Sequence, residues 1–252
     1  MGKKYKNPPI IEAVCEFRLT PDSPWDLTVP GLIYEKIKKE FPHREQRLIQ
    51  EIELTQGPQG LQQQIRTQEG VLFFTEDRKM FVHIGPHLLA INCLKPYPSW
   101  TGFQPKIEKA FQALIETVEE IKGLHRVGLR YINKIEMLSS PIKLEDYFEF
   151  YLYLGTRLPQ NVANFIVGCD FLYANGRDQC RVQLKPTASL SSERPSFFLD
   201  IDYFTAKPNE LKVTEAINWV KEAHNVVEEI FEGCINDRLR ALFQEVREDG
   251  AS

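Results

Sequence analysis

The amino-acid sequence predicts an α+β protein in which a curved antiparallel sheet is covered by two long helices. Three observations lead to this prediction. Several segments alternate apolar and polar residues, as strands do, and two long segments carry apolar residues at helical spacing. The same order of elements also occurs in both halves of the chain. The 252 residues, 42% of them hydrophobic and 26% charged, have the composition of an ordinary globular protein with a sizeable core.

The first half, residues 1–123, is expected to open with a half-buried strand over residues 10–19. Apolar side chains occupy its odd positions from 11 to 19, whereas Glu12, Glu16 and Arg18 fall on the other face. A helix is expected from about Pro30, a favourable first-turn residue, and Pro42 ends it.

The rest of this half is expected to form strands and one long helix. Strands are predicted at 48–54, 61–67, 71–75, 79–84 and 88–94, with turns at 57–60 and 76–78. The helix is predicted from 101 to 122, where apolar residues recur every three or four positions, and Gly123 is its natural stop.

The second half, residues 124–252, repeats this order. It is expected to contain, in sequence, a strand at 126–137, a short helical stretch at 144–151, strands at 162–174, 179–185 and 197–204, a long helix at 209–231 and a helical extension at 234–246. Asn175-Gly176 is a strong hairpin signal between the first two later strands. Strict alternation in 179–185 indicates that one face of the sheet is wet, which favours antiparallel pairing.

The repeated order predicts an internal duplication whose two halves form one globular unit. By topological analogy the arrangement is similar to the TATA-binding-protein-like and helix-grip folds. The opening strands, 10–19 and 126–137, are the candidates for the seam between the halves. If they pair, Glu12 and Glu16 are expected to bridge Arg130 and Lys134.

Charge and cysteine content favour a reduced cytoplasmic protein. The net charge of −4 argues against a general nucleic-acid binder, and no apolar run approaches the roughly 20 residues that span a bilayer. The first nine residues lack the apolar core of a signal peptide. The five cysteines are odd in number and form no C-x-x-C pair, so reduced, mostly buried thiols are expected, with no metal and no cofactor.

Two stretches carry a resemblance to a known family. One runs from Asn7 to Val14 and reads NPPIIEAV; the other runs from Arg126 to Asn133 and reads RVGLRYIN. Together they resemble the hallmarks of a sporadically distributed bacterial family of proteins of about this length. The family has no established activity, so the resemblance implies no catalytic residues. Its patchy distribution implies a context of mobile or defence-type gene modules.

The second motif supplies the main binding candidates. Arg126, Arg130 and Lys134 recur every four residues, so on a strand they share one face at intervals of roughly 13 Å. Such a basic row suits a phosphate, a carboxylate or an acidic partner. The alternative is a solvated sheet face balanced by nearby glutamates such as Glu136. Tyr131 and Asn133 of the same motif complete this candidate set.

Three aromatic residues and two acids form the other candidates. Trp100 either anchors the long helix on the sheet or stands at a binding cleft. Phe198 and Phe204 share a strand face with Asp200 and Asp202, which suggests a contact surface. The paired acids suit Mg²⁺ or acid–base work, but no third carboxylate or nucleophile is visible nearby.

The sequence contains no phosphate-binding loop, dinucleotide fingerprint, zinc-protease helix, nucleophile elbow or kinase signature. We therefore expect a non-enzymatic binding or adaptor protein that engages a protein partner through its sheet face or the cleft between its halves. The runner-up is a small-ligand or nucleotide-binding module that uses the basic row. A metal-dependent hydrolase or nuclease is the least favoured, and the sequence leaves the oligomeric state open.

Overall fold

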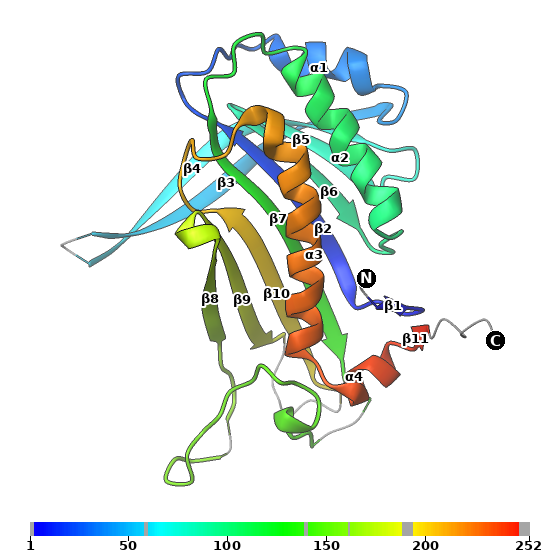
Figure 1. Cartoon of the computed structure of the whole chain (residues 1–252), viewed down its shortest axis with the longest axis vertical. Helices are drawn as coiled ribbons and strands as arrows, with labels where there is room; N and C mark the ends of the chain where they lie inside the picture. Colours follow the sequence, from blue (N-terminus) through cyan, green and yellow to red (C-terminus); the bar gives the residue numbers. More distant parts are fainter. Residues whose placement is uncertain (1–2, 58–59, 139–140, 161, 188–193, 247–252) are drawn as a thin grey trace.

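Nine strands form one antiparallel sheet in the computed structural model, which describes residues 3–57, 60–138, 141–160, 162–187 and 194–246. Across the sheet the strands are β3 (His43–Gly57), β4 (Gly60–Phe74), β5 (Met80–Gly85), β6 (Leu88–Leu94), β2 (Ile10–Leu19), β7 (Leu124–Glu136), β10 (Ser196–Thr205), β9 (Asp178–Pro186) and β8 (Val167–Tyr173) (Figure 1). The predicted α+β class with a large antiparallel sheet is confirmed. The predicted pairing of the two opening strands is confirmed as well, because β2 lies beside β7 at the middle of the sheet.

Helices cover one face of this sheet (Figure 1). They are α1 (Val29–Ile37), α2 (Trp100–Ile115) and α3 (Ala216–Cys234), followed by the short α4 (Asp237–Leu242). Helix α3 packs over β7 and β10, whereas α2 packs on β6 and against α1. The core lies between these layers, where for example the rings of Phe17 and Phe111 stack with centroids 4.4 Å apart.

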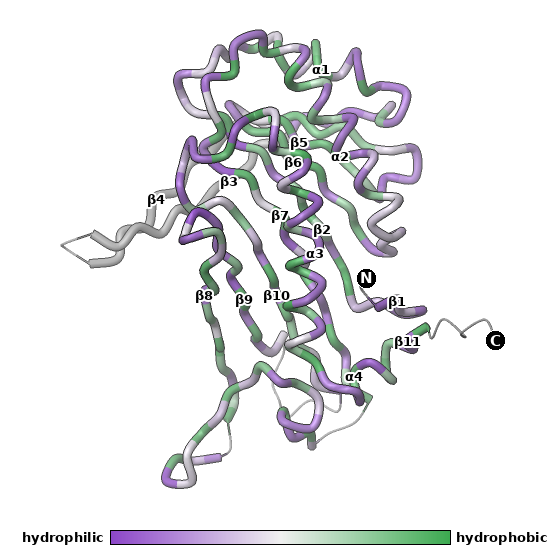
Figure 2. The backbone as a smooth tube through the Cα atoms, viewed as in Figure 1, coloured by the Kyte–Doolittle hydropathy of each residue, from purple (hydrophilic) through white to green (hydrophobic). Residues whose placement is uncertain are grey.

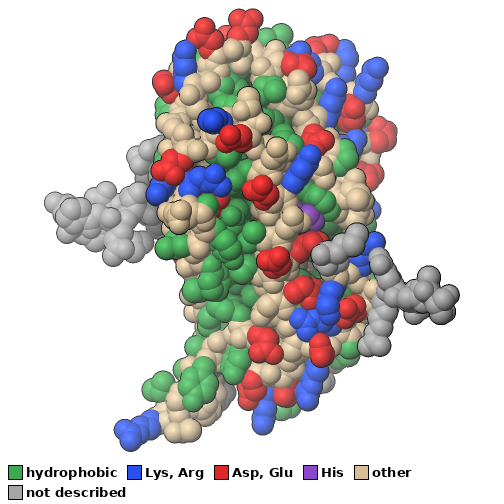
Figure 3. All heavy atoms as spheres, in the orientation of Figure 1, with side chains coloured by type: hydrophobic (Ala, Val, Ile, Leu, Met, Phe, Trp, Pro, Cys, Tyr) green, Lys and Arg blue, Asp and Glu red, His purple; other side chains and the backbone are tan. Residues whose placement is uncertain are grey.

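The strand pattern separates a covered face from an open one. In β7, Val127, Leu129 and Tyr131 are buried beneath the helices, while Arg130 points to the open face. Figure 2 shows the same alternation of hydrophobic and hydrophilic residues along the central strands. The helices do not extend over the β8 edge, and hydrophobic side chains are visible beside α3, over β8 and β9 (Figure 3). Among the described residues, no helix has both the length and the apolarity required to cross a membrane.

Some predicted boundaries are wrong. The helix expected to reach residue 122 ends at Ile115, because the chain turns back to dock on the end of β2. There the Lys122 amide donates to Ser23 Oγ and the Thr20 amide donates to the Gly123 carbonyl. The strands expected at 61–67 and 71–75 are one continuous strand, β4. Two residues of the turn expected at 57–60, Pro58 and Gln59, lie outside the described residues.

The second half departs from prediction near residues 144–151 and at its end. Only a single 3₁₀ turn, Leu144–Asp146, forms there, because the next residues follow the chain at the end of α3: Phe148 forms a bridge with Ile235 and is buried. Strand β8 begins at Val167, five residues later than expected. The extension after α3 becomes α4 and then β11 (Glu245–Val246), which pairs with β1 (Lys4–Tyr5). The two ends of the described chain therefore lie side by side (Figure 1).

Candidate functional site

The eight residues that sequence reasoning selects lie on opposite faces of the sheet. One group lines a cleft on the helix side: Trp100, Tyr131 and Asn133. The other group lies on the open face: Arg126, Arg130, Lys134, Phe198 and Phe204. The predicted residues therefore fall into two separate groups with different surroundings.

The cleft has a volume of about 940 Å³ and lies between the start of α2, the middle of α3 and the N-terminal segment. Aromatic and proline side chains form much of its wall, among them Tyr97, Pro98 and Phe231. Its volume is at the upper end of the range, roughly 300–1,000 Å³, that small-molecule sites occupy. The sequence left two roles open for Trp100, and the structure is consistent with both, because the side chain packs against the core beside Phe103 and also lines the cleft.

A line of hydrogen bonds holds the aromatic side of this cleft in place. His224 of α3 lies beneath Trp100, with ring centroids 4.0 Å apart and planes 15° from parallel. Its Nδ1 is 3.3 Å from the hydroxyl of Tyr131, and its Nε2 is 3.2 Å from a carboxylate oxygen of Glu228. The Tyr131 hydroxyl is in turn 3.0 Å from that of Tyr97.

The direction of these bonds follows from what each group can donate. A carboxylate oxygen accepts, so in the His224 tautomer that donates from Nε2 to Glu228, Nδ1 accepts from the Tyr131 hydroxyl. Tyr131 then accepts from Tyr97. Burial raises the pKa of Tyr131 far above its ordinary value and raises that of Tyr97 as well. Both phenols are therefore neutral hydrogen-bonding groups at physiological pH and are poorly suited to act as bases.

We expect Tyr131→Phe to lower the free energy of unfolding by about 1–3 kcal/mol, because it leaves both Tyr97 and His224 without their shared partner in a buried place. Urea denaturation measures this loss. Tyr34→Phe is the matched control: it removes a single hydrogen bond, to the Pro42 carbonyl, from a half-buried hydroxyl. Equal losses in the two variants would contradict the proposed line of bonds.

Lysines surround the mouth of the cleft. Lys3, Lys4 and Lys6 come from the N-terminal segment, and Lys221 comes from α3. The acidic Glu232 on the same wall accepts hydrogen bonds from the hydroxyl of Tyr5 and from Arg240. The described cleft lining contains four lysines against two glutamates, a positive balance that is reduced where Lys3 pairs with Glu245 and Lys221 with Glu108.

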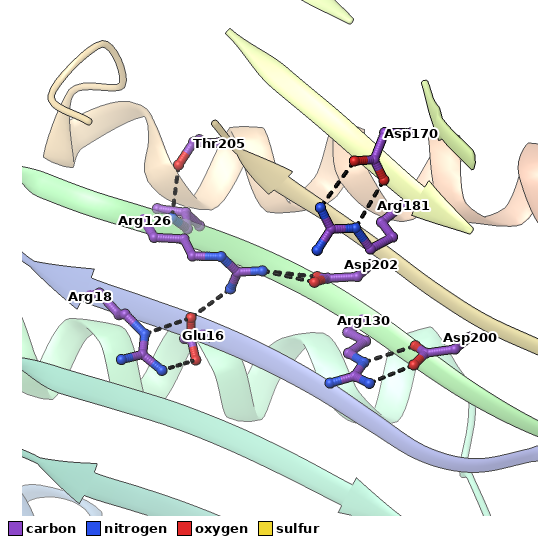
Figure 4. Close-up of polar contacts among 10 residues, drawn as sticks. Glu16, Arg18, Arg126, Arg130, Asp170, Arg181, Asp200, Asp202 and Thr205 are labelled. Atoms are coloured by element: carbon purple, nitrogen blue, oxygen red, sulfur yellow. Dashed lines mark hydrogen bonds and ion pairs between the residues drawn. The ribbon is translucent and has the colours of Figure 1, made fainter. Parts of the chain in front are cut away.

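On the open face, Arg126 is the centre of an ion-pair network (Figure 4). Its guanidinium donates to Glu16 on β2 and, 2.9 Å away, to Asp202 on β10. The expectation that Glu12 and Glu16 bridge Arg130 and Lys134 is therefore wrong. Arg130 instead pairs with Asp200, at 2.8 Å from Nε to Oδ1, and Lys134 pairs with Glu136. Glu12 accepts a hydrogen bond from Asn92.

Burial and charge act in opposite directions on the two carboxylates that share Arg126. Burial by itself raises the pKa of Glu16, but Arg126 and Arg18 outweigh it and hold that pKa below its ordinary value. In Asp202 burial prevails over Arg126 and Arg130, so its pKa is raised. Side chains of Glu16, Asp202 and Arg126 are 17%, 19% and 26% exposed, so the network is largely shielded from water.

The aromatic residues of this face lie beneath cations. Phe204 has the guanidinium of Arg126 at 4.7 Å from its ring centroid and that of Arg181 at 5.8 Å. Phe198 has the Lys185 ammonium at 5.9 Å. These contacts account for large aromatic rings on a face without helices, because cations above them reduce their exposure to water.

The predicted acid pair, Asp200 and Asp202, is engaged by arginines of the neighbouring strand. Throughout the described ranges, no group of three or more His, Cys, Asp or Glu side chains is arranged to hold a metal ion. The five thiols are free, and only Cys169, on β8, is exposed. Burial raises the pKa of the other four, to about 11 for Cys93 and about 12 for Cys180 and Cys234.

Sequence reasoning did not select the cleft residues His224 and Tyr97. Two signals were available. His224 and Glu228 are spaced i,i+4 on a predicted helix, and Tyr97 lies in the proline- and aromatic-rich segment before Trp100. What brings them together is the packing of α3 against β7, which no local pattern reveals.

No family model matches the chain, and no curated protein sequence is significantly similar to it.

Proposed function

We propose that this chain is a binding protein, and that the cleft between α2 and α3 binds a small molecule with a planar ring and an anionic group. The observation that carries the proposal is the Trp100–His224 stack at the wall of a cleft of about 940 Å³ whose mouth is lined with lysines. A planar ring can stack on a fixed aromatic wall, and an anion is attracted by the ammonium groups.

Two features favour binding over catalysis: both ring nitrogens of His224 are engaged within the chain, by Tyr131 and Glu228, and the phenols and buried thiols remain protonated. A covalent or acid–base mechanism needs a nucleophile or base with a pKa near the working pH. In the described cleft and core, the phenols of Tyr97 and Tyr131 and the buried thiols have pKa values shifted upward by burial. These groups therefore remain protonated and serve as hydrogen-bonding and packing groups.

The basic row is less suited to a ligand than the cleft. Arg126, Arg130 and Lys134 each contact a carboxylate of the chain itself. An anion would have to displace that carboxylate. In the cleft, Lys3 and Lys221 also pair with carboxylates, those of Glu245 and Glu108, but the cleft adds a cavity of about 940 Å³ with an aromatic wall. We therefore place the small-ligand function, which the sequence associated with the row, in the cleft.

We also propose that the two halves are related by duplication, as in TATA-binding-protein-like and helix-grip folds. In each half the first strand occupies the centre, the chain moves to the sheet edge, the strands return one by one, and a helix follows. The resemblance to the sporadically distributed bacterial family, with its mobile or defence-type context and a cytoplasmic location, belongs to the same proposal.

The test uses 8-anilinonaphthalene-1-sulfonate, a fluorescent probe that combines a planar ring system with one negative charge. We expect one probe to bind per native chain with enhanced emission. Trp100→Ala should weaken binding by up to about tenfold, because an aromatic pair contributes roughly 0.5–1.5 kcal/mol beyond area burial.

Trp25→Ala is the matched control, because Trp25 also lies against a histidine, His87, at 5.4 Å but away from the cleft. Circular dichroism checks that both variants are folded. Absence of a stoichiometric site, or equal weakening by the two substitutions, would refute the assignment of the cleft.

A further inference from the structure

Strand β8 is one end of the sheet. It pairs with β9 on one side, and within the described part of the chain no strand pairs with its other side. The backbone groups along that side are therefore a template for a further strand. Native proteins usually protect such edges with charges, prolines or bulges, but Val167–Tyr173 contains a single charged residue, Asp170.

The edge is also unusually apolar. Ile166 and Leu172 are 69% and 67% exposed, and Phe171 is 39% exposed. The preceding loop adds exposed Tyr153 and Leu158. In Figure 3 hydrophobic side chains follow this side of the molecule, and in Figure 2 β8 is coloured mostly as hydrophobic. An exposed apolar strip of this kind marks an interaction surface.

Charges on the open face show what chemistry a further strand would meet. Alternating charges cross the sheet from strand to strand: Glu16, Arg126, Asp202, Arg181 and Asp170. Asp202 lies directly opposite Arg181, and Arg181 directly opposite Asp170. The row ends with the carboxylate of Asp170, which is 41% exposed. If the alternation continued onto a further strand beside β8, the residue next to Asp170 would be a cation.

A second copy of this chain does not supply that cation through β8. When a strand pairs with its own copy about a two-fold axis, residues equally far from the axis face each other. Full overlap of Val167–Tyr173 places Asp170 opposite Asp170 of the other copy, and the strand has no basic residue. Like charges directly opposite each other destabilise a strand pair.

We propose that β8 binds an extended segment of a partner protein, which adds a tenth strand to the sheet and places a lysine or arginine opposite Asp170. Its neighbouring residues, on the other face of the new strand, are apolar and cover Cys169 and Phe171. Backbone hydrogen bonds supply affinity, while the cation and the apolar side chains supply specificity. This surface is separate from the cleft, so neither proposal depends on the other.

The probes are three short labelled peptides in which valine alternates with threonine and the central threonine is replaced by lysine, glutamine or glutamate. Fluorescence polarisation measures their binding to the full chain. We expect the lysine peptide to bind about two- to fivefold more tightly than the glutamine peptide, the range of a cross-strand charge pair, and the glutamate peptide to bind most weakly.

Asp170→Asn should remove the preference for lysine while retaining binding of the glutamine peptide. Asp200→Asn is the matched control, because Asp200 lies on the same face but on β10, away from the edge, and the preference should persist there. The proposal is overturned if no peptide binds, if binding ignores the central residue, if the preference survives Asp170→Asn, or if sedimentation shows that the chain dimerises through β8.

Discussion

Replacement of Arg126 by methionine is expected to lower the free energy of unfolding by about 3 kcal/mol, the effect of breaking a largely buried ion pair by removal of one partner. Methionine retains much of the packing volume above Phe204 but leaves two carboxylates, Glu16 and Asp202, without their shared cation. Each is less than a fifth exposed, so water compensates only in part. Urea denaturation followed by circular dichroism measures the loss.

Arg181→Met is the control for this substitution. Arg181 also lies over Phe204 and also pairs with a carboxylate, Asp170, but both members of the pair are more than 40% exposed. Its loss is expected to cost at most about 1 kcal/mol. Neutralising the two carboxylates that lose Arg126, by Glu16→Gln and Asp202→Asn, should restore much of the stability that Arg126→Met loses. Equal losses for the two arginines would show that burial of the network contributes nothing.

The cost of Arg126→Met should also depend on pH. In the native chain the lowered pKa of Glu16 contributes stability above the unfolded value, and acid removes that contribution as pH falls through the folded pKa. Without Arg126, the pKa of Asp202, already raised by burial, rises further, and Glu16 retains only Arg18, so at Asp202 the folded variant binds more protons than the unfolded chain. Its stability therefore rises as pH falls. The free energies of unfolding of Arg126→Met and of the native chain should therefore approach each other as the pH is lowered from 7 to about 5.

The sequence predicts the sheet because its strands have a clear period of two. In β2 and β7 that period determines which side chains face the helices, and the predicted pairing follows from the similar position of these strands in the two halves. The partners of Arg126 could not be predicted in the same way. They depend on the register of the strands. Glu16 lies opposite Gly128, two residues from both Arg126 and Arg130, so the sequence does not show which arginine it contacts. Asp202 comes from a third strand, β10.

The cleft was less accessible to sequence reasoning than the sheet. Trp100, Tyr131 and Asn133 were selected one by one, from an aromatic segment and from a motif. These three residues line one cavity because of the way α2 and α3 pack on the sheet. The pairing of β1 with β11 at the chain ends closes another side of the same cavity. The exposed edge at β8 was missed for a related reason. Its apolar residues are typical of a buried strand. The limited reach of α3 leaves Phe171 partly uncovered, whereas Leu172 shares the face without helices with Asp170.

Gly128 explains the centre of the R-x-G-x-R motif and leads to the second large effect. It is buried between Glu16 on β2 and Phe204 on β10, and the guanidinium of Arg126 lies across it. A Cβ atom at this position would be 2.6 Å from Arg126 Nη1. Valine should therefore displace the guanidinium from its position between the two carboxylates. Because a displaced guanidinium keeps its charge nearby, we expect Gly128→Val to lower the free energy of unfolding by at most the roughly 3 kcal/mol of Arg126→Met.

Gly168→Val provides the matched glycine on the same face. The nearest atom to a Cβ there, Gln183 Cγ, is 3.6 Å away, and valine suits a strand, so this variant should be neutral or slightly stabilising. Coupling decides the mechanism: if Gly128 serves to make room for Arg126, then Gly128→Val should cost little in an Arg126→Met background. Additive losses in the double variant would mean that valine disturbs the backbone itself, and the glycine of the motif would then need another explanation.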